Sequence, residues 1–142
     1  MFNSYILISL LSLVLSAYFS STEIAYIVTN KLKIKILSKK DSLVGRSIAY
    51  FSNNSNYFFT TILIGNNIVN ITFSTLATIM LTKYLSDIGI LILSTIILLL
   101  FGEIIPKVIA REIPDTYLAY SISPLYLFNW TIRPIVQVFS FI

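Results

Sequence analysis

The sequence has no cysteine and no histidine among its 142 residues, and only 11% of them are charged. Without thiols and imidazoles, it excludes disulfide frameworks, cysteine nucleophiles, the common zinc sites and imidazole proton relays. Any metal chemistry must therefore use oxygen ligands, which suit hard cations. What fills the chain instead is apolar, because 56% of its residues are hydrophobic. This composition predicts a membrane protein.

The positive charge of the chain is concentrated in one place. The net charge is +4, and five of the ten basic residues lie in "KLKIKILSKK", Lys31 to Lys40, directly after an apolar stretch. Basic clusters in that position anchor the cytoplasmic end of a membrane span. We therefore expect the lipid bilayer, and not a nucleic acid, as the partner of this cluster.

Three apolar stretches are long enough to cross a bilayer, at about residues 5–28, 57–82 and 88–108. The positive-inside rule places Lys31 to Lys40 in the cytoplasm and the N-terminus outside, in a multi-pass protein of the plasma (inner) membrane. A signal peptide is the alternative for the first stretch. It is disfavoured because no Lys or Arg precedes Lys31.

The segments outside these spans predict helices at the membrane interface. Residues 41–56 are too polar to span, and residues 112–142 are interrupted by Pro114, Pro124 and Pro134 and rich in aromatic side chains. A fourth span within 112–142 is the alternative. The predicted fold class is all-α, a polytopic membrane protein with three transmembrane helices plus juxtamembrane, interfacial helices. No internal repeat is present, so two-fold symmetry would require an oligomer.

Polar residues recur at helical spacing inside the first two spans. In the first, Ser16, Ser20 and Glu23 follow one another at intervals of four and three, which places them on one helix face. In the second, Asn66 and Asn70 are four residues apart. They follow a glycine, Gly65, that permits a close helix approach. Such residues either join transmembrane helices by hydrogen bonds or line a polar site.

The third span contains the segment "LLLFGEIIPKVIARE", Leu98 to Glu112, with a carboxylate and a proline in an apolar run. Glu103 lies about 15 residues from the outer end, roughly 22 Å into a core of about 30 Å. An ionisable residue at such depth is costly and predicts function. Pro106 has no N–H, so the carbonyl of Gly102 loses its α-helical partner. Open backbone at this depth is tolerated beside protein or a cavity.

Residue counts place the polar positions of the three spans at similar depths. Ser16 and Asn70 each lie roughly 18 to 20 Å from the outer side, close to the level of Glu103. Hydroxyl, amide, carbonyl and carboxylate oxygens at one level form a ligand set for Mg²⁺, Ca²⁺ or Na⁺. Glu23, nearer the cytoplasm, is either a gate charge or the ion-pair partner of Lys107 or Lys31.

Three motifs, "SAYFSSTEIAY", "TTILIGNNIVNI" and "GEIIPKVIARE", in this order resemble the transmembrane domain of the cyclin-M/CorC family of magnesium transporters. The resemblance implies a homodimer with three spans per subunit, an outside N-terminus, and Mg²⁺ export coupled to Na⁺ entry. It implies an ion site that resembles this ligand set, with serines at Ser16 and Ser20, an asparagine at Asn70 or else Asn66, and the acidic residue at Glu103. The carbonyl of Gly102 is a candidate ligand from the Pro106 argument alone. Family members usually continue into cytoplasmic CBS modules, so we expect such modules if the chain extends beyond Ile142.

Two functions follow from these patterns. The first is transport of a divalent cation, Mg²⁺ in particular, by alternating access with Glu103 as the charged ligand. The alternative is a membrane anchor or regulatory scaffold that does not transport, in which the polar residues only hold helices together. An enzyme is not expected, because a lone intramembrane carboxylate with Ser and Asn lacks a base to activate a nucleophile.

Overall fold

The computed structural model describes residues 2–141, and every element in that range is a helix. In chain order they are α1 (Phe2–Val28), α2 (Lys31–Ser38), α3 (Leu43–Asn53), α4 (Ser55–Leu81), α5 (Asp87–Leu99), the π-helical turn η1 (Leu100–Ile104), α6 (Ile105–Glu112), α7 (Pro114–Thr131) and α8 (Arg133–Phe141). The all-α prediction is confirmed.

Three of these helices are long and apolar enough to cross a membrane. They cover Asn3–Val28, Ser55–Leu81 and Asp87–Glu112, the last being α5, η1 and α6 in continuous succession. Each is 26 or 27 residues long, which at the α-helical rise corresponds to about 40 Å. Within residues 2–141 no other helix meets both conditions, so the structure does not support the alternative of a fourth span.

Local side chains explain where several helices begin. Asn30 accepts a hydrogen bond from the N–H of Leu32 at the start of α2, at 2.9 Å. Ser42 and Ser86 accept bonds from backbone N–H groups three residues on, at the starts of α3 and α5. Such N-caps satisfy donors that have no partner within the helix. The basic cluster is therefore a helix of its own, which the sequence patterns did not predict.

The prolines of the C-terminal segment act differently from one another. Pro114 is the first residue of α7, where a missing N–H costs nothing. Pro134 is the second residue of α8. Pro124, however, lies inside α7, which continues through it. The expectation of broken helices is thus right for the joint between α7 and α8 but wrong at Pro124.

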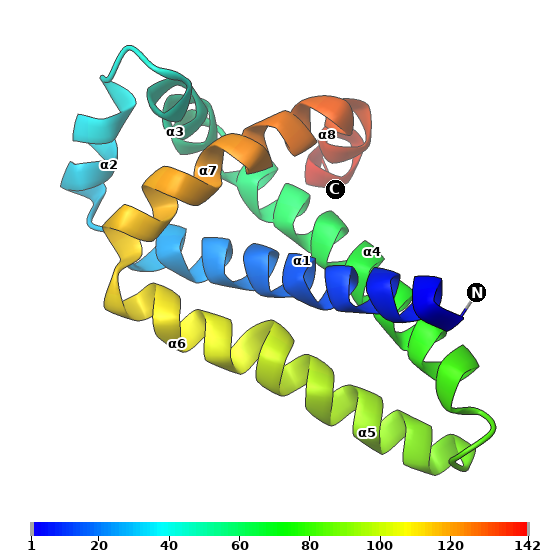
Figure 1. Cartoon of the computed structure of the whole chain (residues 1–142). Coiled ribbons are helices and arrows are strands. Elements are labelled where there is room, and N and C mark those ends of the chain that lie inside the picture. Colours follow the sequence, from blue (N-terminus) through cyan, green and yellow to red (C-terminus); the bar gives the residue numbers. More distant parts are fainter. Residues whose placement is uncertain (1, 142) are drawn as a thin grey trace.

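The helices divide into a spanning bundle and a group of shorter helices at one end (Figure 1). In the bundle α1 packs against α4, η1 and α6, and it also contacts α7. The shorter helices α2, α3, α7 and α8 gather at the end opposite the N-terminus and the turn between α4 and α5. An ion pair between Lys33 Nζ and Asp115 Oδ2, at 2.7 Å, joins α2 to α7.

Burial differs sharply between the two ends of the molecule. Aromatic rings pack together near the short helices, with Tyr26 stacked on Phe58 at 4.1 Å between ring centroids and Phe51 fully buried. Along α5, in contrast, apolar side chains such as Ile88 and Leu91 are about two-thirds exposed. A surface this apolar suits hydrocarbon, as a span would require.

Candidate cation site

Ser16 lies at the point where α1 meets α4, and it is fully buried. Its Oγ is 2.8 Å from Oδ1 of Asn70 and 3.3 Å from Oδ1 of Asn66. A serine hydroxyl carries one hydrogen, so it satisfies only one of these amide oxygens fully. Three side-chain oxygens therefore converge at one point. They share a single hydroxyl hydrogen, so lone pairs on them remain free to accept a hydrogen bond or to bind a cation.

A glycine and an aromatic ring bring α1 and α4 together next to this point. A Cβ on Gly65 would lie 2.4 Å from the ring atom Cζ of Phe19, a distance that no side chain tolerates. The Phe19 ring therefore occupies the space that a side chain at 65 would need. Gly65 therefore makes room for a side chain of α1, as its place beside the polar residues suggested, and the prediction of a close approach between the helix backbones stays a prediction.

The third span reaches the same point through Gly102, which is buried. A Cβ built on Gly102 would lie 2.9 Å from Ser16 Oγ. Only a glycine lets the backbone of η1 come this close to the hydroxyl. The structure thus brings Ser16, Asn66, Asn70 and Gly102 together, at the common depth that the residue counts predicted.

The backbone around Gly102 is a π-turn, which the sequence patterns did not predict. The N–H of Ile105 bonds to the carbonyl of Leu100, five residues back, and not to that of Phe101. The next donor position, Pro106, has no N–H. The Phe101 carbonyl therefore loses both of its regular helical donors. Turns of this kind are frequent at functional sites.

This geometry refines the expectation for the Gly102 carbonyl. Pro106 does remove its α-helical donor, as predicted. In a π-turn, however, the N–H of Lys107 is a second candidate partner, five residues on. The carbonyl of Phe101 therefore joins that of Gly102 as a candidate ligand. Proline spacing alone could not reveal this, because it does not distinguish a kinked α-helix from a π-turn.

Glu103 follows Gly102 directly and is partly exposed. Among residues 2–141 its carboxylate forms no hydrogen bond and no ion pair. Its Cα lies about 3.8 Å from that of Gly102, as across any trans peptide. It is thus the anionic side chain nearest in sequence to the converging oxygens, although no hydrogen bond ties it to them.

The remaining predicted residues lie between Ser16 and the end of α1 that precedes the basic segment Lys31–Lys40. Ser20 is one helical turn along, with its Oγ buried and without a hydrogen-bond partner among the described residues. Glu23 is partly exposed and forms no ion pair with Lys31 or Lys107, so that alternative is wrong. Its role as a gate charge stays a prediction.

These oxygens set the chemistry that the site can perform. Within residues 2–141 no group of three or more His, Cys, Asp or Glu side chains comes together. The oxygens that a cation would meet here are neutral amide, hydroxyl and carbonyl oxygens and its own water, and the carboxylate next to them in sequence is that of Glu103. Mg²⁺ commonly binds in this way, through one or two carboxylates while keeping several waters.

The fold and this site define a polytopic membrane protein with an oxygen-lined polar site among its three spans. The family model for the Cyclin M transmembrane N-terminal domain matches residues 7–142, and the chain belongs to that family. This confirms the resemblance drawn from the three motifs.

Individual relatives agree with this membership. A UPF0053 protein of Haemophilus influenzae is 33% identical over 76% of this chain and 26% of its own length. The UPF0053 inner membrane protein YfjD of Escherichia coli is 31% identical over 71% of this chain and 24% of its own length. The UPF0053 protein MG146 of Mycoplasma genitalium is 34% identical over 95% of this chain and 34% of its own length. The chain thus spans between a quarter and a third of the curated relatives it matches.

Proposed function

We propose that this chain is the membrane domain of a divalent-cation transporter that binds Mg²⁺ at the meeting point of its three spans. The observation that carries the proposal is the convergence of Ser16, Asn66 and Asn70 oxygens on a glycine backbone, one residue from an unpaired intramembrane carboxylate. A carboxylate in a span is costly unless it has a partner. A cation supplies that partner.

The finer features of the transporter rest on the family. We propose Mg²⁺ export coupled to Na⁺ entry by alternating access, in a homodimer of the inner membrane with an outside N-terminus. Relatives about three times as long as this chain support further domains in the whole protein, with CBS modules as our expectation.

The decisive experiment changes the charge of the site without its shape. Glu103→Gln should abolish saturable Mg²⁺ binding measured by calorimetry on the purified protein, because the anionic ligand is lost. Glu112→Gln removes the same charge from the exposed end of α6 and is the matched control. It should bind like the parent.

A second pair of variants tests the amide ligand. Asn70→Ala should weaken Mg²⁺ binding by removing the oxygen 2.8 Å from Ser16. Asn67→Ala removes the same group from an exposed position of α4 and should have no such effect. If Glu103→Gln binds and transports Mg²⁺ like the parent, the site lies elsewhere.

One observation favours the scaffold alternative. The hydrogen bond from Ser16 to Asn70 joins α1 to α4 without any ion. Such bonds are typical of helix association in membranes. In that case Ser16→Ala should destabilise the fold, while Glu103→Gln should leave both folding and Mg²⁺ binding unchanged.

A further inference from the structure

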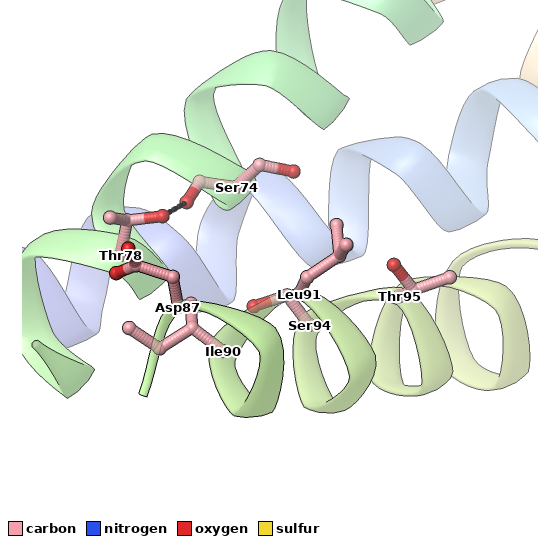
Figure 2. A pocket seen from close by; sticks show the side chains of 7 residues that line it. All are labelled: Ser74, Thr78, Asp87, Ile90, Leu91, Ser94 and Thr95. Atoms are coloured by element: carbon pink, nitrogen blue, oxygen red, sulfur yellow. Dashed lines mark hydrogen bonds between the residues drawn. The ribbon is translucent and has the colours of Figure 1, made fainter. Parts of the chain in front are cut away.

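A second cavity lies between α4 and the first half of α5, away from the site described above, and oxygen-bearing side chains interrupt its largely apolar lining (Figure 2). Its volume is about 370 Å³. Apart from two apolar residues of α5, the residues that line it carry side-chain oxygens, namely Ser74, Thr78, Asp87, Ser94 and Thr95. A hydrated cation with six waters needs roughly 180 Å³, at about 30 Å³ per water, so the cavity has room for one.

Ser94 shows that this cavity calls for a polar occupant. The residue is 7% exposed, and its Oγ is buried without a hydrogen-bond partner among the described residues. A buried hydroxyl without a partner costs free energy that water or an ion would recover. No packing reason requires a hydroxyl there, because alanine would fill nearly the same space.

Thr78 adds an oxygen suited to a cation or its water. Its hydroxyl donates to the backbone carbonyl of Ser74 at 2.8 Å, as Figure 2 shows. Because its one hydrogen is used in this way, its oxygen has only lone pairs to offer to the cavity. Such an oxygen accepts a hydrogen bond from the water shell of a cation.

The cavity lies in line with the central site along α4. Asn66, Asn70, Ser74 and Thr78 follow one another at intervals of four residues. Successive members lie on neighbouring positions of the helix surface, about 6 Å apart along the axis. The inner edge of the cavity is therefore one helical turn from the amide oxygen that contacts Ser16.

Asp87 gives the cavity its charge. It is the first residue of α5, exposed, and among residues 2–141 its carboxylate forms no ion pair. Because Asp87 is exposed to solvent and Mg²⁺ dehydrates reluctantly, an ion held by this carboxylate keeps its water. The set is suited to hold the ion in its hydrated form.

We infer that this cavity is an outer vestibule, which holds a hydrated divalent cation through Asp87 and the four hydroxyls one step outside the central site. The inference rests on the proposed function and on the outside location of the turn between α4 and α5. It assigns Asp87, Ser94 and Thr78 a role that the central site does not need.

The test uses single cysteines in this cysteine-free chain, reconstituted in proteoliposomes. Ser94→Cys places a thiol in the cavity. The control is Ile92→Cys, which places a thiol on the same helix at a residue that is 55% exposed and does not line the cavity. The probe is a trimethylammonium methanethiosulfonate added from outside. Ser94→Cys should react roughly tenfold faster than Ile92→Cys, because a hydrated anionic cleft concentrates the cationic reagent.

Mg²⁺ and the carboxylate are then varied. External Mg²⁺ at about 10 mM should slow the reaction at Ser94→Cys severalfold, compared with choline chloride of equal ionic strength. This high concentration is needed because a hydrated ion is expected to bind weakly. Adding Asp87→Asn should remove this protection, whereas Asp87→Glu should keep it. Equal reactivity at the two cysteines, or protection that survives Asp87→Asn, would overturn the vestibule and leave Asp87 as an ordinary residue of a helix start.

The Glu103→Gln variant separates this inference from the proposed function. Protection at Ser94→Cys that persists while calorimetric binding is lost supports both sites. Loss of calorimetric binding without any Mg²⁺ protection at Ser94→Cys overturns the vestibule alone. Protection at Ser94→Cys together with unchanged binding in Glu103→Gln overturns the central site alone.

Discussion

At the scale of single residues, the candidate site depends on how little space surrounds Ser16. Its side chain is fully buried, and its hydroxyl lies close to two amide oxygens and to the backbone of Gly102. Close packing makes such a point intolerant of even one added methyl group. The absence of a side chain at Gly102 is therefore what allows η1 to pack against Ser16.

Gly102→Ala tests this packing. The new methyl would lie 2.9 Å from Ser16 Oγ, so either η1 or the hydroxyl must move. We expect a loss of about 1–3 kcal/mol in stability, the usual cost of overpacking, seen as earlier thermal unfolding of the purified protein in detergent.

Gly89→Ala is the matched control for this variant. A Cβ on Gly89 would meet its nearest atom, Ser86 Oγ, at 3.4 Å, close to ordinary van der Waals contact. The same substitution should there be neutral or stabilising by up to about 1 kcal/mol, because Ala favours a helix over Gly. Equal unfolding temperatures for the two variants would contradict the close approach at Gly102.

At the scale of elements, the third span is the least regular of the three. α5 and α6 are separated by the π-turn η1, which ends just before Pro106. A π-turn inserts one extra residue into a helical turn and changes which faces of the two halves align. The carbonyls of Phe101 and Gly102 lie at this irregularity, beside Glu103.

Pro106→Ala should restore a regular helix here. The new N–H can bond to the Gly102 carbonyl, and the N–H of Ile105 can then bond to the carbonyl of Phe101, as in a regular α-helix. We expect weaker Mg²⁺ binding with normal membrane insertion, measured by calorimetry and by membrane fractionation. Unchanged Mg²⁺ affinity would remove the carbonyls of Phe101 and Gly102 from the site.

At the scale of the whole molecule, the two ends of the bundle are chemically different. One end carries the short helices with the basic segment Lys31–Lys40, and the other carries the N-terminus and the turn between α4 and α5 (Figure 1). Basic residues favour the cytoplasmic side of a membrane. This asymmetry is the basis for the proposed orientation.

Cysteine labelling tests the orientation directly. Thiols introduced at Asn3 and at Tyr84, which is 75% exposed, should react with an impermeant reagent in intact cells. A thiol at Ser38, in α2, should react only after permeabilisation. Labelling at Ser38 in intact cells would reverse the assigned inside and outside ends, and with them the location of the proposed vestibule.

The sequence by itself determined the three spans, the common depth of Ser16, Asn70 and Glu103, and the family. These follow from composition and from the constant rise of a regular helix, which turns residue counts into depth. The contact of Gly65 with a neighbouring helix was also predictable, since a glycine beside polar residues in a span is typical of a helix–helix contact.

Only the tertiary structure decided which atoms meet. Nothing in the spacing showed that both Asn66 and Asn70 face Ser16, because a face of an isolated helix has no partner until another helix packs on it. The π-turn at Phe101 and the buried hydroxyl of Ser94 were equally hidden. Residue counting assumes a regular helix and carries no information about neighbours far apart in sequence, whereas these features depend on a local departure from regularity and on contacts between different helices.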